Sequence, residues 1–118
     1  QNPKWSIQNQ RYHLLEQELL DHSVALTERV MVNDPPGYYL ASERQAVAVP
    51  YGGTQTILDV AKRYEISYLL LEPDHPVGAV DLYLNPKQYP GFCYLETVED
   101  TRIFMLSPDT ACMDVETW

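Results

Sequence analysis

The sequence has no long apolar run, few basic residues and only two cysteines. A helix that crosses a bilayer needs about 18 or more consecutive apolar residues, and no run in this chain approaches that length. Eight lysines and arginines stand against 17 aspartates and glutamates, which gives a formal net charge of -9. An acidic surface repels phosphate backbones and anionic lipid headgroups. We therefore expect no nucleic acid partner and no binding to an acidic membrane leaflet.

The two cysteines, Cys93 and Cys112, are too far apart for a CxxC motif, and no further cysteine completes a zinc site. Cys93 lies in a strand-like run, where a cysteine is usually a small buried apolar residue. We favour two unpaired cysteines, with a disulfide between them as the alternative. His13 and His22 are nine residues apart on a predicted helix and cannot share a metal from one helix face. We predict no metal and no cofactor.

The periodicity of apolar residues predicts a first helix over about residues 6–22. Its apolar stripe would contain Tyr12, Leu14, Leu15, Leu19 and Leu20. β-Branched and apolar runs over 29–33, 45–50 and 67–72 predict strands. The last run contains four consecutive apolar residues, which predict a central strand covered on both faces. Between the last two strands, Gly52 and Gly53 break the chain, and Thr54 would cap a helix.

That helix would bury Ile57, Ala61 and Tyr64, with Leu58 and Val60 beside them. Strand, helix and strand at this spacing predict a βαβ unit with parallel strands. A short helix over 77–84 and an antiparallel β-hairpin around Glu99-Asp100 would follow.

The predicted fold class is therefore α/β: a small sandwich with a mixed, partly parallel sheet of about five strands, helices packed on it and a C-terminal β-hairpin. Residues 1–106 would form a single α/β domain, and residues 107–118 a loose C-terminal tail. The chain begins with Gln1 rather than Met. We expect it to be a piece of a longer protein or a processed chain.

The stretch VMVNDPPGYYL contains the first candidate site. Asn33 and Asp34 offer acceptors at the carboxyl end of a strand, where open α/β sheets place their ligands. Tyr38 and Tyr39 offer ring faces that stack on sugars. The favoured alternative is structural: Pro-Pro-Gly shapes a turn, with Gly37 able to take a positive φ, and the tyrosines cover the sheet edge.

Two further groups of residues have weaker functional interpretations. Gly52 and Gly53 precede a helix and could hold an anion, and Glu72 stands where a dinucleotide fold binds ribose. The G-x-G-x-x-G fingerprint is absent, so we favour a glycine turn. Glu72, Asp74 and His75 could bind a metal or move a proton, but a solvated turn is the favoured interpretation.

No catalytic residue is predicted from the residues themselves. The serines lack a G-x-S-x-G elbow, and no cysteine has a helical position beside a basic residue. Carboxylates are numerous, but sequence alone does not pair two of them across a cleft.

Three stretches occur in a telling order: YHLLEQELL, then RVMVNDPPGYYLASERQAVAVPYGG, then ILDVAKRYEISYLLLEPDHP. From about Tyr12 to Leu106 the chain resembles the soluble region after the last membrane span of bacterial GT-C class glycosyltransferases. The similar members are related to dolichyl-phosphate-mannose protein mannosyltransferases and to the lipid A aminoarabinose transferase. The resemblance implies a parent enzyme with many membrane spans that uses a polyprenyl-phosphate-linked sugar.

By this resemblance, the chain lies on the extracytoplasmic side, in the periplasm or at the cell surface. Its partners would be the membrane-embedded remainder of the same parent chain and a saccharide or lipid-linked sugar. The family's catalytic acids lie near the start of the parent, so this part would be non-catalytic. It would cap the active cavity or help to select the acceptor. The alternatives are a small soluble nucleotide- or sugar-binding module and, more weakly, a protein-interaction domain that uses a sheet edge.

Overall fold

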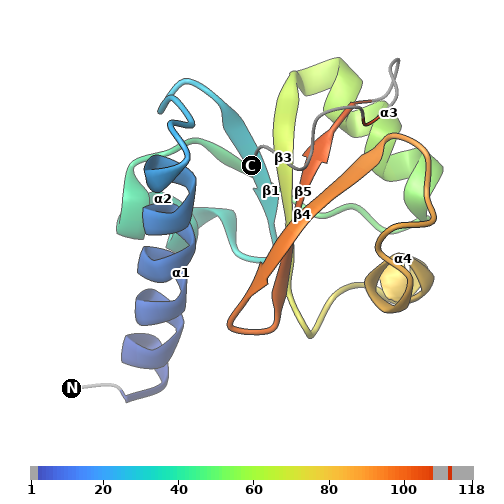
Figure 1. Ribbon diagram of the computed structural model, residues 1–118. Coiled ribbons are helices and arrows are strands. Elements are labelled where there is room, and N and C mark those ends of the chain that lie inside the picture. Colours follow the sequence, from blue (N-terminus) through green and yellow to red (C-terminus); the bar gives the residue numbers. More distant parts are fainter. Residues whose placement is uncertain (1–2, 108–111, 113–118) are drawn as a thin grey trace.

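The computed structural model describes residues 3–107 and residue 112, and a five-stranded sheet forms its centre (Figure 1). The strands are β1 (Arg29–Val32), β2 (Ala46–Ala48), β3 (Ile66–Leu71), β4 (Phe92–Val98) and β5 (Thr101–Leu106). Their order is β2-β1-β3-β5-β4. β1 runs parallel to β2 and β3, whereas β5 is antiparallel to β3 and β4. The predicted mixed, partly parallel sheet is confirmed.

Helices cover both faces of the sheet (Figure 1). They are α1 (Pro3–Asp21), α2 (Pro35–Ser42), α3 (Thr54–Tyr64) and α4 (Val80–Leu84), with the 3-10 turn η1 (Val77–Ala79) before α4. α1 and α2 lie on one face, and α3 and α4 lie on the other. The predicted first helix therefore begins three residues earlier than expected, at residue 3 instead of 6. The short helix predicted over 77–84 is confirmed as η1 and α4.

Alternation along the strands produces two hydrophobic cores, one on each face of the sheet. In β1, Val30 and Val32 pack with α1 and α2, while Met31 packs with α3 and α4. In β3, Leu70 joins the first core and Leu69 and Leu71 join the second. Because both faces are covered, the inner strands need apolar residues at consecutive positions. The continuous apolar run in β3 is explained in this way.

Some residues predicted to be buried on the helices are exposed. Leu14 is 49% exposed and Leu20 is 46% exposed, whereas Tyr12, Leu15 and Leu19 are fully buried. Each residue of a helix is rotated by about 100° from the one before it, so the neighbours of the buried row turn outward.

Tyr64 lies at the end of α3 and is 49% exposed, so its predicted burial is also wrong.

The Asp-Pro-Pro-Gly segment begins a helix, and the prediction that it forms a turn is wrong. Pro35 and Pro36 occupy the first positions of α2, where the backbone N–H groups have no partner inside a helix. Asp34 is the N-cap, and its Oδ1 accepts a hydrogen bond from Gly37 N–H at 3.1 Å. Gly37 has helical backbone and no positive φ. A Cβ on Gly37 would collide with the carboxylate of Asp34, which explains the glycine.

The predicted C-terminal hairpin is confirmed. β4 and β5 pair antiparallel up to Val98 and Thr101. Glu99 and Asp100 connect them with φ values of 49° and 63°. Positive φ at both residues of a two-residue loop matches the right-handed twist of the two strands.

Cys93 and Cys112 form a disulfide with their Cα atoms 5.4 Å apart, so the favoured prediction of unpaired cysteines is wrong. Local sequence around Cys112 carries no sign that this position returns to β4. The predicted loose tail, residues 107–118, lies outside the described residues apart from Ser107 and Cys112. In the described part of the chain, no helix combines the length and the apolar character required to cross a membrane.

Candidate functional site

The candidate residues follow the carboxyl ends of three parallel strands. Asn33 follows β1, Gly52 follows β2 and Glu72 follows β3, and parallel strands end at the same edge of a sheet. Asn33 N–H donates to Glu72 Oε2 at 2.9 Å, and Asn33 Nδ2 donates to Asp74 Oδ1 at 2.9 Å. The structure therefore brings Asn33, Glu72 and Asp74 together at this edge.

Glu72 is only 2% exposed and lies beneath α1. Its Oε2 also accepts a hydrogen bond from the hydroxyl of Tyr12 at 3.0 Å, and Arg11 Nη1 lies 3.8 Å from Oε1. Burial is the main cause that raises the pKa of Glu72, against the lowering effect of the hydrogen bonds from Asn33 and Tyr12. Burial and the nearby Glu72 carboxylate also raise the pKa of Tyr12. The hydrogen bond between Tyr12 and Glu72 therefore joins α1 to the end of β3.

Glu72, Asp74 and His75 do not converge on one point. The carboxylate of Glu72 faces Tyr12, and that of Asp74 accepts from Asn33. The ring of His75 stacks on Tyr83 with centroids 4.6 Å apart, and its Nδ1 lies 2.8 Å from the main-chain oxygen of Glu72. Three side chains with three separate partners form neither a metal site nor a proton relay.

The paired tyrosines point to different surroundings. Tyr38 is fully buried, and its hydroxyl donates to Glu16 Oε1 at 2.7 Å. Burial and the neighbouring Glu16 carboxylate raise the pKa of Tyr38. Tyr39 is 50% exposed and borders a hollow of about 470 Å³ that also contacts Pro35 and Gln45. Only Tyr39 is therefore accessible to a ligand.

A second, smaller hollow lies on the other side of the start of α2. It measures about 230 Å³ and is bordered by Gln8, Asn9, Tyr12, Asp34 and Gly37, with Pro36 and Leu40 at its rim. The amide of Gln8 donates to Asp34 Oδ2 at 3.2 Å. Asp34 is thereby held by Gln8 and by its capping bond to Gly37, and it borders the hollow as an ordered acceptor.

The Gly52-Gly53 turn is a packing contact. Gly53, and not Thr54 as predicted, is the N-cap of α3, and no side-chain hydrogen bond caps this helix. The backbone at Gly78 packs closely against this turn, so that a Cβ on Gly78 would lie only 2.7 Å from Gly53 N. Both Gly52 and Gly53 have positive φ, at 108° and 97°. These glycines permit a turn and a close approach, in agreement with the favoured interpretation.

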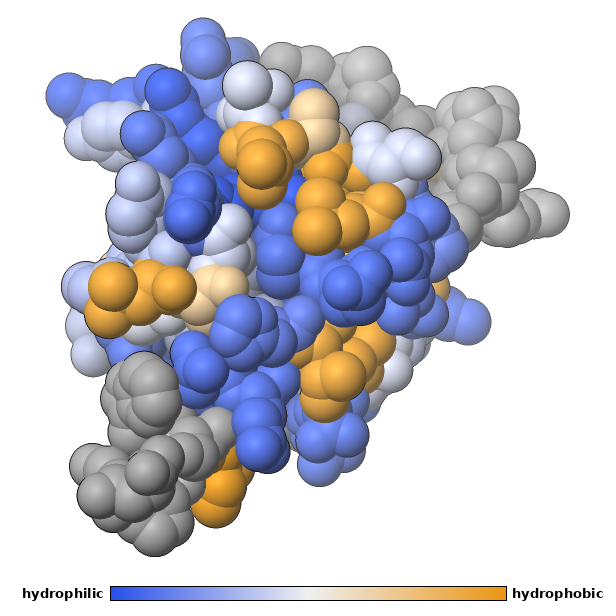
Figure 2. Space-filling model, turned by 90° about the vertical axis from the view of Figure 1, so that its left-hand side faces the viewer, coloured by the Kyte–Doolittle hydropathy of each residue, from blue (hydrophilic) through white to orange (hydrophobic). Residues whose placement is uncertain are grey.

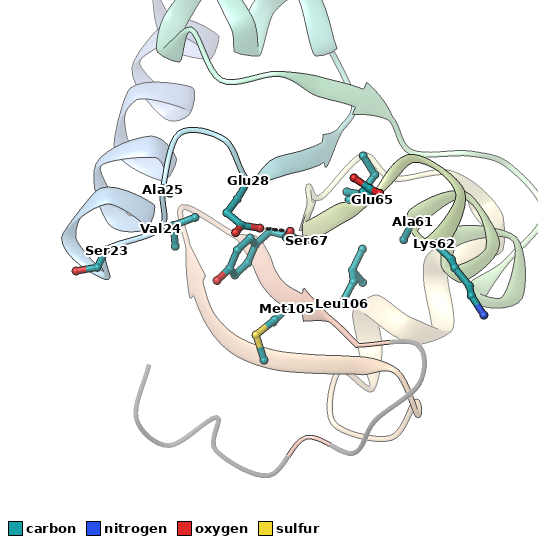
Figure 3. A pocket seen from close by; sticks show the side chains of 12 residues that line it. Ser23, Val24, Ala25, Glu28, Ala61, Lys62, Glu65, Ser67, Met105 and Leu106 are labelled. Atoms are coloured by element: carbon teal, nitrogen blue, oxygen red, sulfur yellow. Dashed lines mark hydrogen bonds between the residues drawn. The ribbon is translucent and has the colours of Figure 1, made fainter.

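A third hollow, larger than the two beside α2, was not predicted from the sequence. It measures about 560 Å³ and lies at the amino ends of β1 and β3 (Figure 3). Its polar lining includes Glu28, Ser67 and Lys62, and Ser67 donates its hydroxyl to Glu28. None of its lining residues is a histidine or a cysteine. Ser67 therefore has no histidine beside it in this hollow, and histidine is the base that most often activates a serine nucleophile.

Sequence reasoning also missed a buried ion pair. Arg44 is fully buried, and its Nε and Nη2 each donate to the carboxylate of Glu16 at 2.8 Å. The remaining N–H groups donate to the main-chain oxygens of Val24, Ala25 and Glu28. All five donors of the guanidinium are used inside the protein, so Arg44 has none left for a ligand. No local pattern marks an arginine after a short helix as buried.

The candidate residues of this edge therefore have structural partners. The carboxylates of Asp34, Glu72 and Asp74 all accept hydrogen bonds from other residues of the chain. What the edge offers to a ligand is the ring of Tyr39 and the two shallow hollows beside α2.

Comparison of the chain with protein-family models, with curated proteins and with solved structures gives no match.

Proposed function

We propose that this chain is a non-catalytic extracytoplasmic domain of a membrane glycosyltransferase that takes its sugar from a polyprenyl-phosphate donor. The resemblance of residues 12–106 provides the enzyme class. The observation that carries the cellular location is the disulfide between Cys93 and Cys112. Disulfides persist in oxidising compartments and are rare in the cytosol. The domain caps the membrane-embedded cavity and contributes to the choice of acceptor.

The state of the candidate residues supports a non-catalytic role. Glu72 is buried beneath α1 by its bond to Tyr12, and Asp34 caps α2. An acid or base in catalysis must reach a substrate proton, within about 3 Å or through one water. Groups held in this way stabilise the domain and leave the chemistry to the rest of the parent enzyme.

The outer side of α1 and α2 supports docking against the remainder of the parent chain. Ile7, Leu14 and Leu20 of α1 and Leu40 of α2 are between 46% and 76% exposed. Figure 2 shows this side of the molecule, where apolar side chains lie in separate patches among hydrophilic residues. Covering these side chains with a partner would be favourable, because burial removes apolar surface from water.

The proposal is tested in the full-length parent enzyme by measuring sugar transfer from a polyprenyl-phosphate donor. The double variant Leu14→Gln/Leu20→Gln should lower transfer while the isolated domain keeps its stability. Leu84→Gln is the matched control, because Leu84 is 65% exposed on α4, across the sheet. Equal transfer by both variants would reject the docking side.

Two outcomes would reject the larger proposal. A parent without residues 1–118 that retains its rate and its acceptor choice would show that the domain has no role in transfer. If the full-length protein contains no membrane span, that is, no run of about 20 apolar residues, its assignment as a membrane glycosyltransferase is rejected.

A second candidate function, a sugar-binding module, is favoured by the accessible ring of Tyr39 and the hollows beside α2. Aromatic faces and ordered polar acceptors together suit a saccharide. NMR titration with mono- and oligosaccharides should shift the signals of Tyr39 and Gln45. Tyr39→Ala should abolish the shift of Gln45, and Tyr51→Ala, at an 80% exposed tyrosine, should preserve it. Unmoved signals at millimolar sugar would exclude this function.

A further inference from the structure

Three side chains with metal-binding chemistry meet where α1 lies against β4. They are Glu18 near the end of α1, His22 in the turn directly after this helix, and Glu96 of β4. One carboxylate oxygen from each glutamate and a ring nitrogen of the histidine all lie within 4.8 Å of one another. This cluster is separate from the candidate residues at the carboxyl ends of the parallel strands.

Glu18 and His22 have a spacing that allows both to bind one metal ion. Residues four apart lie on the same side of a helix, which is the spacing that helical metal pairs use. His22 Nε2 lies 3.1 Å from Glu18 Oε2. The main-chain N–H of His22 donates to the main-chain oxygen of Glu18, as in a helical turn. In this part of the sequence we considered only His13 with His22 as metal ligands, and their spacing does not reveal the pair of Glu18 and His22.

An irregularity in β4 turns Glu96 toward the helix. Tyr94 packs in the core beneath α3, and Leu95 packs in the core beneath α1. Strict alternation would return Glu96 to the side of Tyr94. The register shifts between Tyr94 and Glu96, so that Glu96 pairs with Ile103, a residue of the α1 core. The bulge therefore places two consecutive side chains on the α1 side and brings the carboxylate of Glu96 to the helix.

We propose that Glu18, His22 and Glu96 bind a divalent transition-metal ion of the zinc type, which ties α1 to the bulge of β4. One imidazole and two carboxylates are ligands that zinc accepts, and the two carboxylates offset its charge. Glu96 Oε2 is shielded from solvent, while the side chains of His22 and Glu18 are 26% and 28% exposed. Zinc is usually four-coordinate, so three protein ligands at this partly exposed position leave one coordination position for water.

For the test, the protein is first treated with a chelator, and the chelator is then removed. Calorimetric titration with zinc chloride should show one ion per chain, and the NMR signals of the His22 ring should shift on binding. His22→Ala and Glu96→Gln should each weaken zinc binding by at least about tenfold. His13→Ala is the matched control, because His13 is exposed on the same helix, and it should bind zinc like the native protein. Magnesium and calcium should bind weakly, since they prefer sites made only of oxygen ligands.

Stability gives an independent readout. Zinc should raise the melting temperature of the native protein and of His13→Ala, but not of Glu96→Gln, because an ion that binds only the folded state stabilises it. No zinc binding at millimolar concentration, or binding that His22→Ala and Glu96→Gln leave intact, would overturn the proposal. The cluster would then be an ion pair between His22 and carboxylates, without a metal function.

Discussion

The buried arginine of the first core provides the sharpest test of this structure. In the variant Arg44→Met, a side chain of comparable length replaces the guanidinium and removes its donors. Arg44 forms five hydrogen bonds, two to the carboxylate of Glu16 and three to main-chain oxygens of the segment 24–28. The substitution leaves Glu16 buried without its cation.

The expected loss of stability is large. Removing one partner of a buried ion pair costs about 3–5 kcal/mol, because the remaining charge stays buried without compensation. For a chain of this length, about 1 kcal/mol corresponds to roughly 4 °C in melting temperature, so Arg44→Met should lower it by roughly 12–20 °C.

Urea unfolding, followed by far-UV circular dichroism at neutral pH, measures the effect. Arg29→Met is the control: Arg29 is exposed, and its Nη1 donates to the Tyr64 main-chain oxygen at 2.8 Å. We expect it to change the free energy of unfolding by less than about 1 kcal/mol. A double-mutant cycle with Glu16→Leu isolates the pair. The double variant should lose less stability than the sum of the single variants, since neither charge remains buried alone.

A cost below about 1 kcal/mol for Arg44→Met, with an unchanged denaturant slope, would refute this reasoning. Additive effects in the cycle would also refute it, because they would mean that Arg44 and Glu16 do not depend on each other.

Three further predictions concern other contacts. Burial raises the pKa of Glu72 above its ordinary value of 4.5, so the folded protein binds this proton more tightly than the unfolded chain does. Ionisation of Glu72 therefore lowers the free energy of unfolding as the pH rises above 4.5. Glu72→Gln should therefore gain stability relative to the native protein between about pH 4 and pH 7 in urea unfolding, and a constant difference would contradict this. Cys112→Ser, which opens a bridge across 19 positions, should lower the free energy of unfolding by about 3 kcal/mol, as should a reducing agent on the native protein. A loss below about 1 kcal/mol would show that the bond contributes little. Gly37→Ala should cost about 1 kcal/mol by displacing the capping carboxylate of Asp34, and melting curves that coincide with those of the native protein would reject this reason for the glycine.

Much of the fold was predictable because local patterns specify it. The period of Ile57 and Ala61 marks the buried side of α3, and the apolar run of β3 marks an inner strand. Pro-Pro-Gly misled the prediction, since proline is compatible both with a turn and with the first positions of a helix. Asp34 decided between the two by capping α2.

The candidate site was predictable only as a location. The parallel strands bring Asn33, Glu72 and Asp74 to one edge, as the predicted βαβ unit required. Their chemistry was not predictable, because the partner of Glu72 is Tyr12, on a helix that the sequence does not place above β3. The same holds for Glu96, whose direction depends on a bulge that no residue type marks.

By itself, the sequence determined the acidic charge, the mixed α/β class, the central position of β3 and the hairpin at Glu99-Asp100. Each of these depends on composition or on residues close together in the chain. Only the tertiary structure decided the bond of Tyr12 to Glu72 across 60 positions and the disulfide across 19. It also decided whether Tyr38 or Tyr39 is accessible. These outcomes depend on how helices pack on the sheet, and packing joins side chains whose sequence neighbours carry no information about each other.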